Sequence, residues 1–393
     1  MIPTTRLKLD DALWLRGEAI DKTQRNARTE TRMLRERGVA VCLLKNSADP
    51  AELAEIRKLV FQSDRHVILS RLGGKELNAL RPIFESRRNF SLVVDDWWSM
   101  PGWFNRHADY LIFRNYNGMI VRAGLGPLVP AGAGVPWFCA PEKMAWYPIA
   151  CSLLRGPALL ASPFWNGLKA VQRRSDQRDP KTMIYFPFPI AAEDVPLGTE
   201  KLEHDFSNLG GTCGYWVMRD AHSPAEMTFA NLYYDRKRLI ELIGQFEGNP
   251  FTVFDWRRNG RFLPFDDYAC ELRKSRFTVA TGGYHLASIP KYLEYICLGT
   301  PIIGAGLPYE YPWLDECMVS VDIMRTTPAQ LKPQLHAALD RYEKLREQCL
   351  SWREKLFKLY DIHCLLEIAQ LQIDGQPVPP GYLKNLPTGA PGS

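Results

Sequence analysis

Apolar runs of strand length alternate with helical patterns through the first 115 residues. Strands are predicted at 39–44, 66–70, 90–98 and 109–115, which are largely apolar. Helices are predicted at 19–37, 51–61 and 75–87, where the pattern has helical spacing. Strands separated by helices of this length predict βαβ units and a parallel sheet.

A second alternation follows a connector that contains several prolines. The connector, residues 184–205, is predicted to be extended because its prolines are incompatible with a regular helix. Beyond it, strands are predicted at 205–211, 251–256, 277–281, 300–306 and 320–323, and helices at 225–245, 268–276 and 288–298. Residues 328–372 have the pattern of two helices, the second beginning at Ser351.

The two alternations predict an α/β fold with two Rossmann-like domains that face each other across a cleft. A length of 393 residues also favours two domains over one. We expect a first domain at 1–195, a second at 196–350, a C-terminal helix at 351–373 and a flexible tail at 374–393. Because ligands of open α/β sheets bind outside the carboxyl ends of the strands, functional residues are expected directly after strands.

Composition narrows the class of protein. With 46% hydrophobic and 24% charged residues, the chain is typical of a globular protein. The net charge of +5 comes without a polybasic segment, which argues against a nucleic-acid partner. Nine cysteines without a C-x-x-C pair argue against a disulfide framework and a zinc site, and they fit a reducing, cytoplasmic compartment.

Three features of the sequence bear on a membrane contact. The start of the chain, residues 1–10, is polar and charged, which does not fit a signal peptide. The apolar stretch 145–165 is interrupted by prolines and Arg155, so it is a poor membrane span. Four arginines recur at helical spacing and form a basic stripe on one predicted helix: Arg25, Arg28, Arg32 and Arg35. A solvated face explains this stripe, and docking to anionic lipid or to an acidic glycan acceptor is the alternative, which leaves a peripheral membrane contact open.

The stretch SIPKYLEYICLGTPIIGAG at 288–306 has the strongest local chemistry. Pro290 suits the first turn of a short helix and Gly299 suits its end. A strand, a glycine-bearing loop and a helix N-terminus form an anion site, to which Lys291 adds a full charge for a diphosphate. Glu294, one turn further along, can accept hydrogen bonds from adjacent hydroxyls such as those of a ribose. The alternative is an ordinary ion pair on the helix surface.

The residues around this stretch form a wider pattern: a helix with L..S.F, a strand, a glycine loop, K-x-x-E and G-x-P-I. Its positions are Leu272, Ser275, Phe277, Gly282, Gly283, Lys291, Glu294, Gly299, Pro301 and Ile302. The pattern resembles the nucleotide-sugar site of GT-B fold glycosyltransferases, in particular the exostosin-like and spore-maturation-type branches. The resemblance implies that Glu294 holds the ribose and Lys291 the diphosphate, that a UDP-sugar is the favoured donor, and that the C-terminal helix crosses back to the first domain.

The chain departs from the classical retaining pattern of that fold at one position. A second glutamate would stand eight residues before the ribose-binding one, where this chain has Leu286, with His285 beside it. Whether the anomeric configuration of the donor is retained or inverted therefore stays open.

Further donor-binding candidates follow predicted strands. The backbone of Gly210 and Gly211 can approach a phosphate closely, although a plain turn explains the pair nearly as well. Arg219 can neutralise a diphosphate. The glycine loop also contains Tyr284, which can stack on a base or sugar, His285, which can contact phosphate or sugar, and Ser288.

Catalytic candidates come from the first domain. Asp95 and Asp96 end a predicted strand, and either carboxylate can act as the general base that an inverting transferase needs. A helix N-cap is the structural alternative. His107 is a rival base, although a structural histidine explains it better. Adjacent carboxylates on a strand point to opposite faces, so they do not form a metal-binding Asp-x-Asp pair, and no metal is expected.

The sequence thus predicts a metal-independent glycosyltransferase whose partners are a nucleotide sugar and a glycan or lipid-linked acceptor. A nucleotide-sugar epimerase or hydrolase of the same fold is one alternative, and a non-catalytic glycan- or nucleotide-binding partner subunit is another. A dinucleotide-dependent oxidoreductase is disfavoured because no G-x-G-x-x-G follows an early strand.

Overall fold

The structure is a computed structural model of the whole chain. It describes the following residues: 7–18, 25–45, 49–72, 74–87, 89–94, 102–114, 183–209, 234–246, 251–253, 264–280, 290–304, 311–321 and 326–376.

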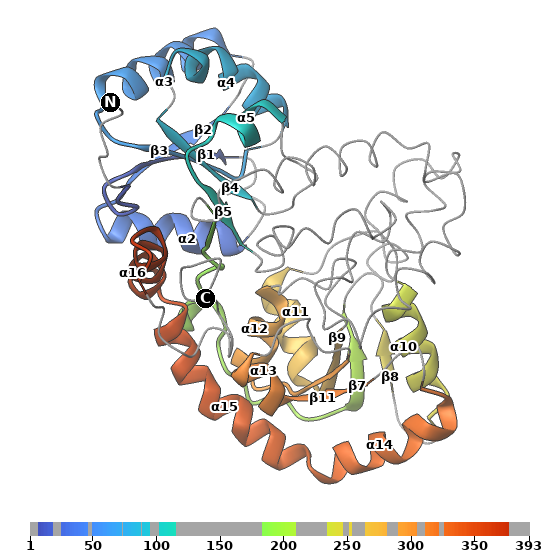
Figure 1. The fold of residues 1–393 in the computed structure, drawn as a ribbon. Coiled ribbons are helices and arrows are strands. Elements are labelled where there is room, and N and C mark those ends of the chain that lie inside the picture. Colours follow the sequence, from blue (N-terminus) through green and yellow to red (C-terminus); the bar gives the residue numbers. More distant parts are fainter. Residues whose placement is uncertain are drawn as a thin grey trace, which may run out of the picture.

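The first sheet consists, in the described part of the chain, of six parallel strands in the order β2-β1-β3-β4-β5-β6 (Figure 1). These strands are β1 (Leu13–Gly17), β2 (Ala40–Leu44), β3 (Val67–Ser70), β4 (Phe90–Val94), β5 (Leu111–Phe113) and β6 (Met183–Tyr185). They are linked in turn by α2 (Arg25–Glu36), α3 (Pro50–Gln62), α4 (Gly74–Ser86) and α5 (Gly102–His107).

The direction of the chain through this sheet reverses after β2. The step from β1 to β2 runs one way across the sheet, and the steps from β2 to β5 run the other way. Because parallel crossovers are right-handed, α2 lies on one face of the sheet and α3, α4 and α5 lie on the other (Figure 1). The carboxyl ends of β1 and β3 therefore flank a topological switch point, where open α/β sheets bind their ligands.

The second sheet is organised in the same way. Its described strands are parallel, in the order β11-β10-β9-β7-β8. They are β7 (His204–Asn208), β8 (Phe251–Val253), β9 (Ser275–Ala280), β10 (Ile302–Gly304) and β11 (Met318–Ser320), with helices α10 (Tyr234–Gly244), α11 (Phe265–Arg273), α12 (Pro290–Cys297) and α13 (Pro312–Cys317). Its switch point lies between β7 and β9, from which the chain proceeds in opposite directions. The predicted α/β class with two parallel sheets is confirmed.

Three details differ from the sequence-based prediction. Strand β1, the second strand in the order of the first sheet, was not predicted, because the charged Arg16 interrupts its apolar run. The first residues of the predicted connector belong to β6, and a short 3-10 helix, η7 (Ala192–Asp194), lies further along it. The last segment forms three helices rather than two: α14 (Pro328–Asp340), α15 (Tyr342–Leu359) and α16 (Ile362–Ile373).

The predicted helix start at Ser351 is wrong, since Ser351 lies inside α15. The boundaries of these helices are set by capping residues, which the hydrophobic period does not reveal. Thr327 forms a capping box with Gln330 at the start of α14, and the Asp361 side chain accepts a hydrogen bond from the His363 backbone N–H at the start of α16.

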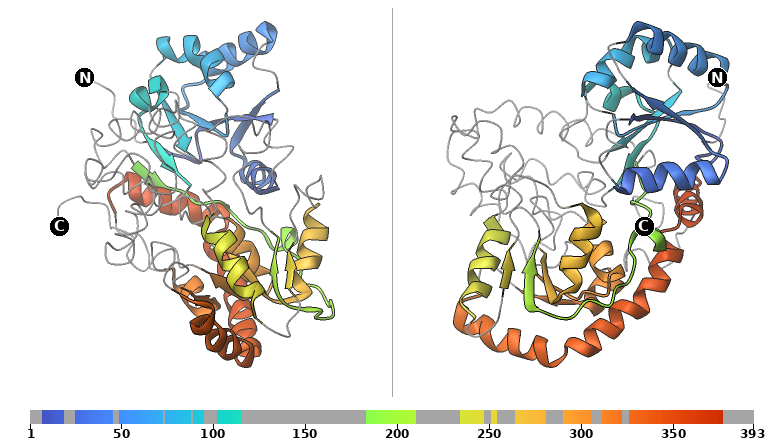
Figure 2. Two further views of the ribbon diagram at one scale, coloured as in Figure 1. Left: turned by 90° about the vertical axis from the view of Figure 1, so that its right-hand side faces the viewer. Right: turned by 180° about the vertical axis from the view of Figure 1, so that it is seen from behind.

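The C-terminal helices connect the two sheets. Helix α15 packs on α12 and α13 of the second sheet, and α16 packs on α2 and β6 of the first (Figure 2). The Gln372 side-chain amide accepts a hydrogen bond from the backbone N–H of Tyr185 (2.9 Å) and donates one to its carbonyl (2.8 Å). This side chain thereby pairs the backbone of β6, which is the last strand in the described order of the sheet. No helix in the described residues has both the length and the apolar character needed to cross a membrane.

One largely buried histidine gives a pH-dependent prediction. His66, just before β3, has Nδ1 2.5 Å from the Asn89 amide oxygen and Nε2 2.7 Å from Ser91 Oγ. Burial lowers the pKa of His66 to about 4, although the hydrogen bond to Asn89 opposes this shift. The unfolded chain takes up the proton near pH 6.5, so between that pH and about 4 the unfolded state binds more protons than the folded state.

The free energy of unfolding is therefore expected to decrease as the pH falls through this window, by about 3 kcal/mol in total. Urea denaturation of the parent and of His66→Gln at several pH values between 4 and 7 measures the effect. The His66→Gln protein should have a shallower pH dependence, and an unchanged slope would contradict the assignment.

Candidate functional site

Helix α12 begins and ends where the sequence predicts. It starts at Pro290, and Gly299 follows its end in the left-handed conformation (φ 74°). The Gly299 N–H donates to the Ile296 carbonyl at 3.0 Å, which closes the last turn. One face of the helix is buried against the second sheet and α15: Tyr292, Leu293, Tyr295, Ile296 and Cys297. Lys291 and Glu294 are only partly buried.

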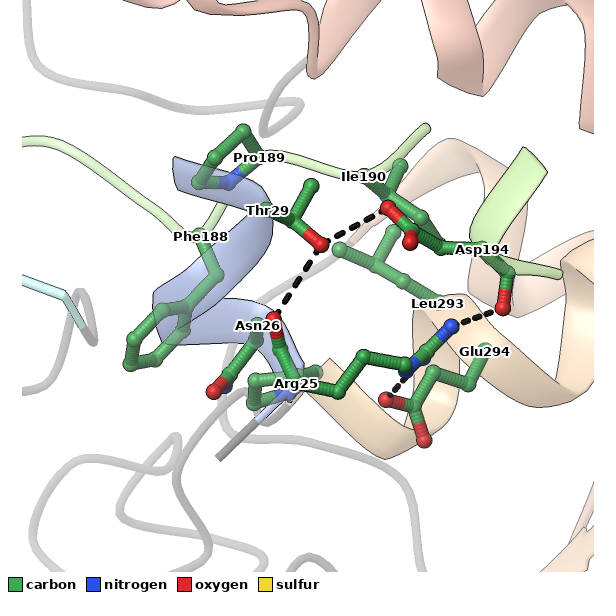
Figure 3. Close-up of a pocket in the computed structure, with 10 residues that line it drawn as sticks. Arg25, Asn26, Thr29, Phe188, Pro189, Ile190, Asp194, Leu293 and Glu294 are labelled. Atoms are coloured by element: carbon green, nitrogen blue, oxygen red, sulfur yellow. Dashed lines mark hydrogen bonds and ion pairs between the residues drawn. The ribbon is translucent and has the colours of Figure 1, made fainter. Parts of the chain in front are cut away.

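Glu294 is turned toward the first sheet. Its Oε1 lies 2.7 Å from Nη2 of Arg25, the first residue of α2 (Figure 3). The two side chains are 14% and 17% exposed, so the ion pair is shielded from most of the solvent. Arg25 also donates to the Asp194 backbone carbonyl, and its guanidinium carbon lies 3.4 Å from the centre of the Phe265 ring. The carboxylate therefore lies in the gap between the sheets and not on an outer surface.

A small pocket surrounds this pair. Residues from α2, from the connector and from α12 line it: Arg25, Asn26, Thr29, Phe188, Pro189, Ile190, Asp194, Pro290, Leu293 and Glu294 (Figure 3). Helix α2 follows β1 and α12 follows β9, so each helix leaves the carboxyl end of a strand beside its sheet's switch point. Because both sheets direct these ends at one pocket, the pocket lies where open α/β sheets bind their ligands.

Two arginines of the basic stripe on α2 make contacts that the sequence did not predict. Arg25 binds Glu294, and Arg32 forms ion pairs with Glu193 (2.6 Å) and Asp194 (3.4 Å) of the connector. Thr29 Oγ1 adds a 2.7 Å hydrogen bond to Asp194. These two arginines hold the connector and α12 against α2, whereas Arg28 and Arg35 of the stripe are exposed.

Lys291 occupies a neighbouring position. Its Nζ lies 5.7 Å from the centre of the Tyr268 ring, within cation–π range. Among the described contacts, Glu294 has its ion pair with Arg25 and not with Lys291, so the alternative of a Lys291–Glu294 surface pair is wrong.

A buried charge cluster lies at the switch point of the first sheet. Glu30 of α2 accepts hydrogen bonds from Arg16 on β1 (2.9 Å) and from Arg114, which directly follows β5. All three side chains are fully buried. Arg71, which follows β3 with φ 54°, has its guanidinium carbon 4.5 Å from the centre of the Phe188 ring, a residue of the pocket.

Burial by itself would raise the pKa of the Glu30 carboxyl. The charges of Arg114, Arg16 and Arg71 outweigh this effect, and its pKa lies below the ordinary value. Glu30 is therefore ionised at neutral pH and joins the ends of β1 and β5 to α2, which orients the helix that carries Arg25.

Most predicted donor-binding residues lie outside the described residues: Gly210, Gly211, Arg219, Gly282, Gly283, Tyr284, His285 and Ser288. Their place in the chain is nevertheless informative. The two glycine pairs come shortly after β7 and β9, the strands that flank the switch point of the second sheet. Glu294 and Lys291 lie on the helix that follows the second of these segments.

The catalytic candidates divide into two groups. Asp95 and Asp96 lie outside the described residues, directly after the last residue of β4. His107 is the last residue of α5, the helix that leads to the start of β5. It therefore lies near the amino end of the sheet. Its ring stacks on Trp103 at 4.5 Å, with Nδ1 2.8 Å from the Trp103 carbonyl oxygen. Because Arg25 comes after the carboxyl end of β1, the structure does not bring His107 to the pocket.

Sequence reasoning missed the part that Arg25 and Asp194 have in the pocket. Arg25 was recognised only as one of four arginines on a helix, and no local pattern links it to a carboxylate 269 residues away. In the described part of the chain, no group of three or more His, Cys, Asp or Glu side chains is arranged to hold a metal ion.

No family model and no curated protein matches the chain. Among solved structures, sucrose-phosphate synthase from Thermosynechococcus elongatus is similar, with 9% identity, a TM-score of 0.47 and coverage of 91% of this chain and 96% of that one. HepE from Anabaena in complex with UDP-glucose has 9% identity and a TM-score of 0.42, over 86% of each chain. The apo structure of OtsA has 11% identity and a TM-score of 0.38, over 92% of this chain and 86% of that one. These are similarities of fold.

Proposed function

We propose that the protein is a glycosyltransferase that moves a sugar from a nucleotide-diphosphate donor to a glycan or another hydroxyl acceptor. The observation that carries the proposal is the position of Glu294. Its carboxylate lies on the helix that follows a switch-point strand and points into the pocket between the sheets. This is where the K-x-x-E resemblance requires the ribose-binding group to be.

Each part of the donor has a suitable group. The Glu294 carboxylate accepts hydrogen bonds from two adjacent ribose hydroxyls. The Lys291 ammonium and the N-terminus of α12 stabilise the negative charge that grows on the departing nucleotide diphosphate. A cation and a helix dipole supply this stabilisation without a metal ion.

The finer assignments belong to the same proposal. The donor is a UDP-sugar, and the branch is exostosin-like, as the motif at 272–302 implies. Asp95 or Asp96 is the general base, because the chain reaches both directly after the carboxyl end of β4. The acceptor binds the first sheet, and the protein acts in the cytoplasm.

A thermal-shift panel of nucleoside diphosphates tests the proposal. UDP at one hundred times its Kd is expected to stabilise the folded protein by about 2.7 kcal/mol, and the other diphosphates by less. No stabilisation by any nucleoside diphosphate would contradict the function.

Incubation with a UDP-sugar and no acceptor then separates the reactions. A transferase should leave most of the donor intact until a glycan acceptor is added. Release of free sugar, or appearance of an isomerised donor, would indicate a hydrolase or an epimerase. Binding of the donor without turnover, unaffected by replacement of Asp95 and Asp96, would indicate a non-catalytic partner subunit.

A further inference from the structure

The ion pair with Arg25 engages the Glu294 carboxylate, the group that the proposed function assigns to the donor ribose. A carboxylate that holds two adjacent ribose hydroxyls uses both of its oxygens, and Oε1 of Glu294 accepts from Arg25 at 2.7 Å. In the structure without ligand, this oxygen is therefore engaged by a residue of the opposite sheet. Ribose hydroxyls that bind both oxygens of Glu294 therefore compete with Arg25 for Oε1.

Arg25 is suited to a second partner. Its Nε is buried and has no hydrogen-bond partner among the described residues, so one donor of the guanidinium is unused while the Glu294 pair is intact. The Phe265 ring, 3.4 Å from the guanidinium carbon, supports the flat face of the group, whose two Nη atoms donate to the Asp194 carbonyl and to Glu294. A guanidinium edge matches the geometry of phosphate oxygens better than an ammonium does.

The charge of Arg25 determines which group can replace the Glu294 carboxylate as its partner. Displacing Arg25 leaves a partly buried cation without its carboxylate, which is unfavourable unless another anion arrives. A nucleoside supplies hydroxyls alone, whereas a nucleoside diphosphate supplies both the hydroxyls for Glu294 and an anion for Arg25. A diphosphate therefore offers Arg25 a replacement for the carboxylate, and a nucleoside does not.

We infer that Arg25 is a donor-site residue contributed by the first sheet: the ribose displaces it from Glu294, and it then binds the diphosphate of the same donor. This inference rests on the proposed function. Arg25 then links binding of the donor at the second sheet to helix α2 of the first sheet. It also makes the site selective against nucleosides that lack phosphate.

Isothermal titration of uridine and UDP into the full chain tests the inference, with the parent compared with Arg25→Met. Without Arg25, uridine no longer competes with a cation for Glu294, and its Kd should decrease by about tenfold. UDP loses one phosphate contact and one competitor together, so its Kd should change by less than about threefold. The ratio of the uridine Kd to the UDP Kd should therefore decrease by about tenfold.

Two further variants complete the design. Arg35→Met is the matched control, because Arg35 lies on the last turn of the same helix and is exposed. It should leave both Kd values unchanged. Arg25→Lys keeps a positive charge but loses the planar fork, and it should reduce the ratio by about threefold. This variant keeps the test available if Arg25→Met does not fold.

The outcomes separate the two claims. If the Arg25 variants change both Kd values by the same factor, or change neither, the inference is overturned, while UDP binding to the parent still supports the proposed function. If the parent binds neither UDP nor uridine at millimolar concentration, both claims fail.

Discussion

Replacing Glu294 by alanine is expected to abolish the stabilisation of about 2.7 kcal/mol that UDP at one hundred times its Kd gives to the parent protein. The carboxylate is the group that accepts the ribose hydroxyls, and no other described carboxylate on α12 can take its place. Thermal denaturation with and without UDP measures the effect as the shift in melting temperature.

The variant also breaks the ion pair with Arg25, so a control must separate the loss of binding from the loss of a contact between α12 and α2. Glu193→Ala removes the 2.6 Å ion pair with Arg32, which joins the connector to the same helix. It should keep the full UDP-induced shift. If Glu294→Ala responds to UDP as the parent does, the ribose assignment is wrong.

Replacing Glu30 by alanine is expected to lower the free energy of unfolding by about 3–5 kcal/mol. The substitution leaves the guanidinium groups of Arg16 and Arg114 fully buried without the carboxylate that they share. Urea denaturation at pH 7 measures the change. The effect does not depend on any ligand, so it tests the structure separately from the function.

Glu36→Ala is the matched control for Glu30→Ala. Glu36 lies on the same helix, and it pairs with Arg32 at 3.4 Å, but its side chain is 60% exposed. Its loss should change the stability by less than about 0.5 kcal/mol.

A triple variant tests whether the unpaired charge is the cause. Arg16→Met, Glu30→Leu and Arg114→Met together replace the cluster by apolar side chains of similar size. This protein should recover much of the stability that Glu30→Ala alone loses. A triple variant as unstable as the single one would mean that shape, and not charge, makes Glu30 necessary.

Local patterns were sufficient for much of the fold. The strand and helix periods along the chain predicted two parallel sheets, and proline and glycine predicted the bounds of α12, because caps and periods depend on residues close in sequence. Patterns failed where a distant partner overrides a local preference. Strand β1 was missed since its Arg16 looks exposed until Glu30 of α2 is seen to bind it.

The candidate site divides in the same way. The sequence by itself determined that Lys291 and Glu294 lie on a short helix that follows a strand, which places this helix at the carboxyl edge of the second sheet. Only the tertiary structure decided that Glu294 faces the first sheet, that Arg25 binds it, and that His107 lies at the opposite edge from this pocket. The physical reason is that a helix period specifies which face a residue occupies, whereas the packing of whole sheets determines what that face meets.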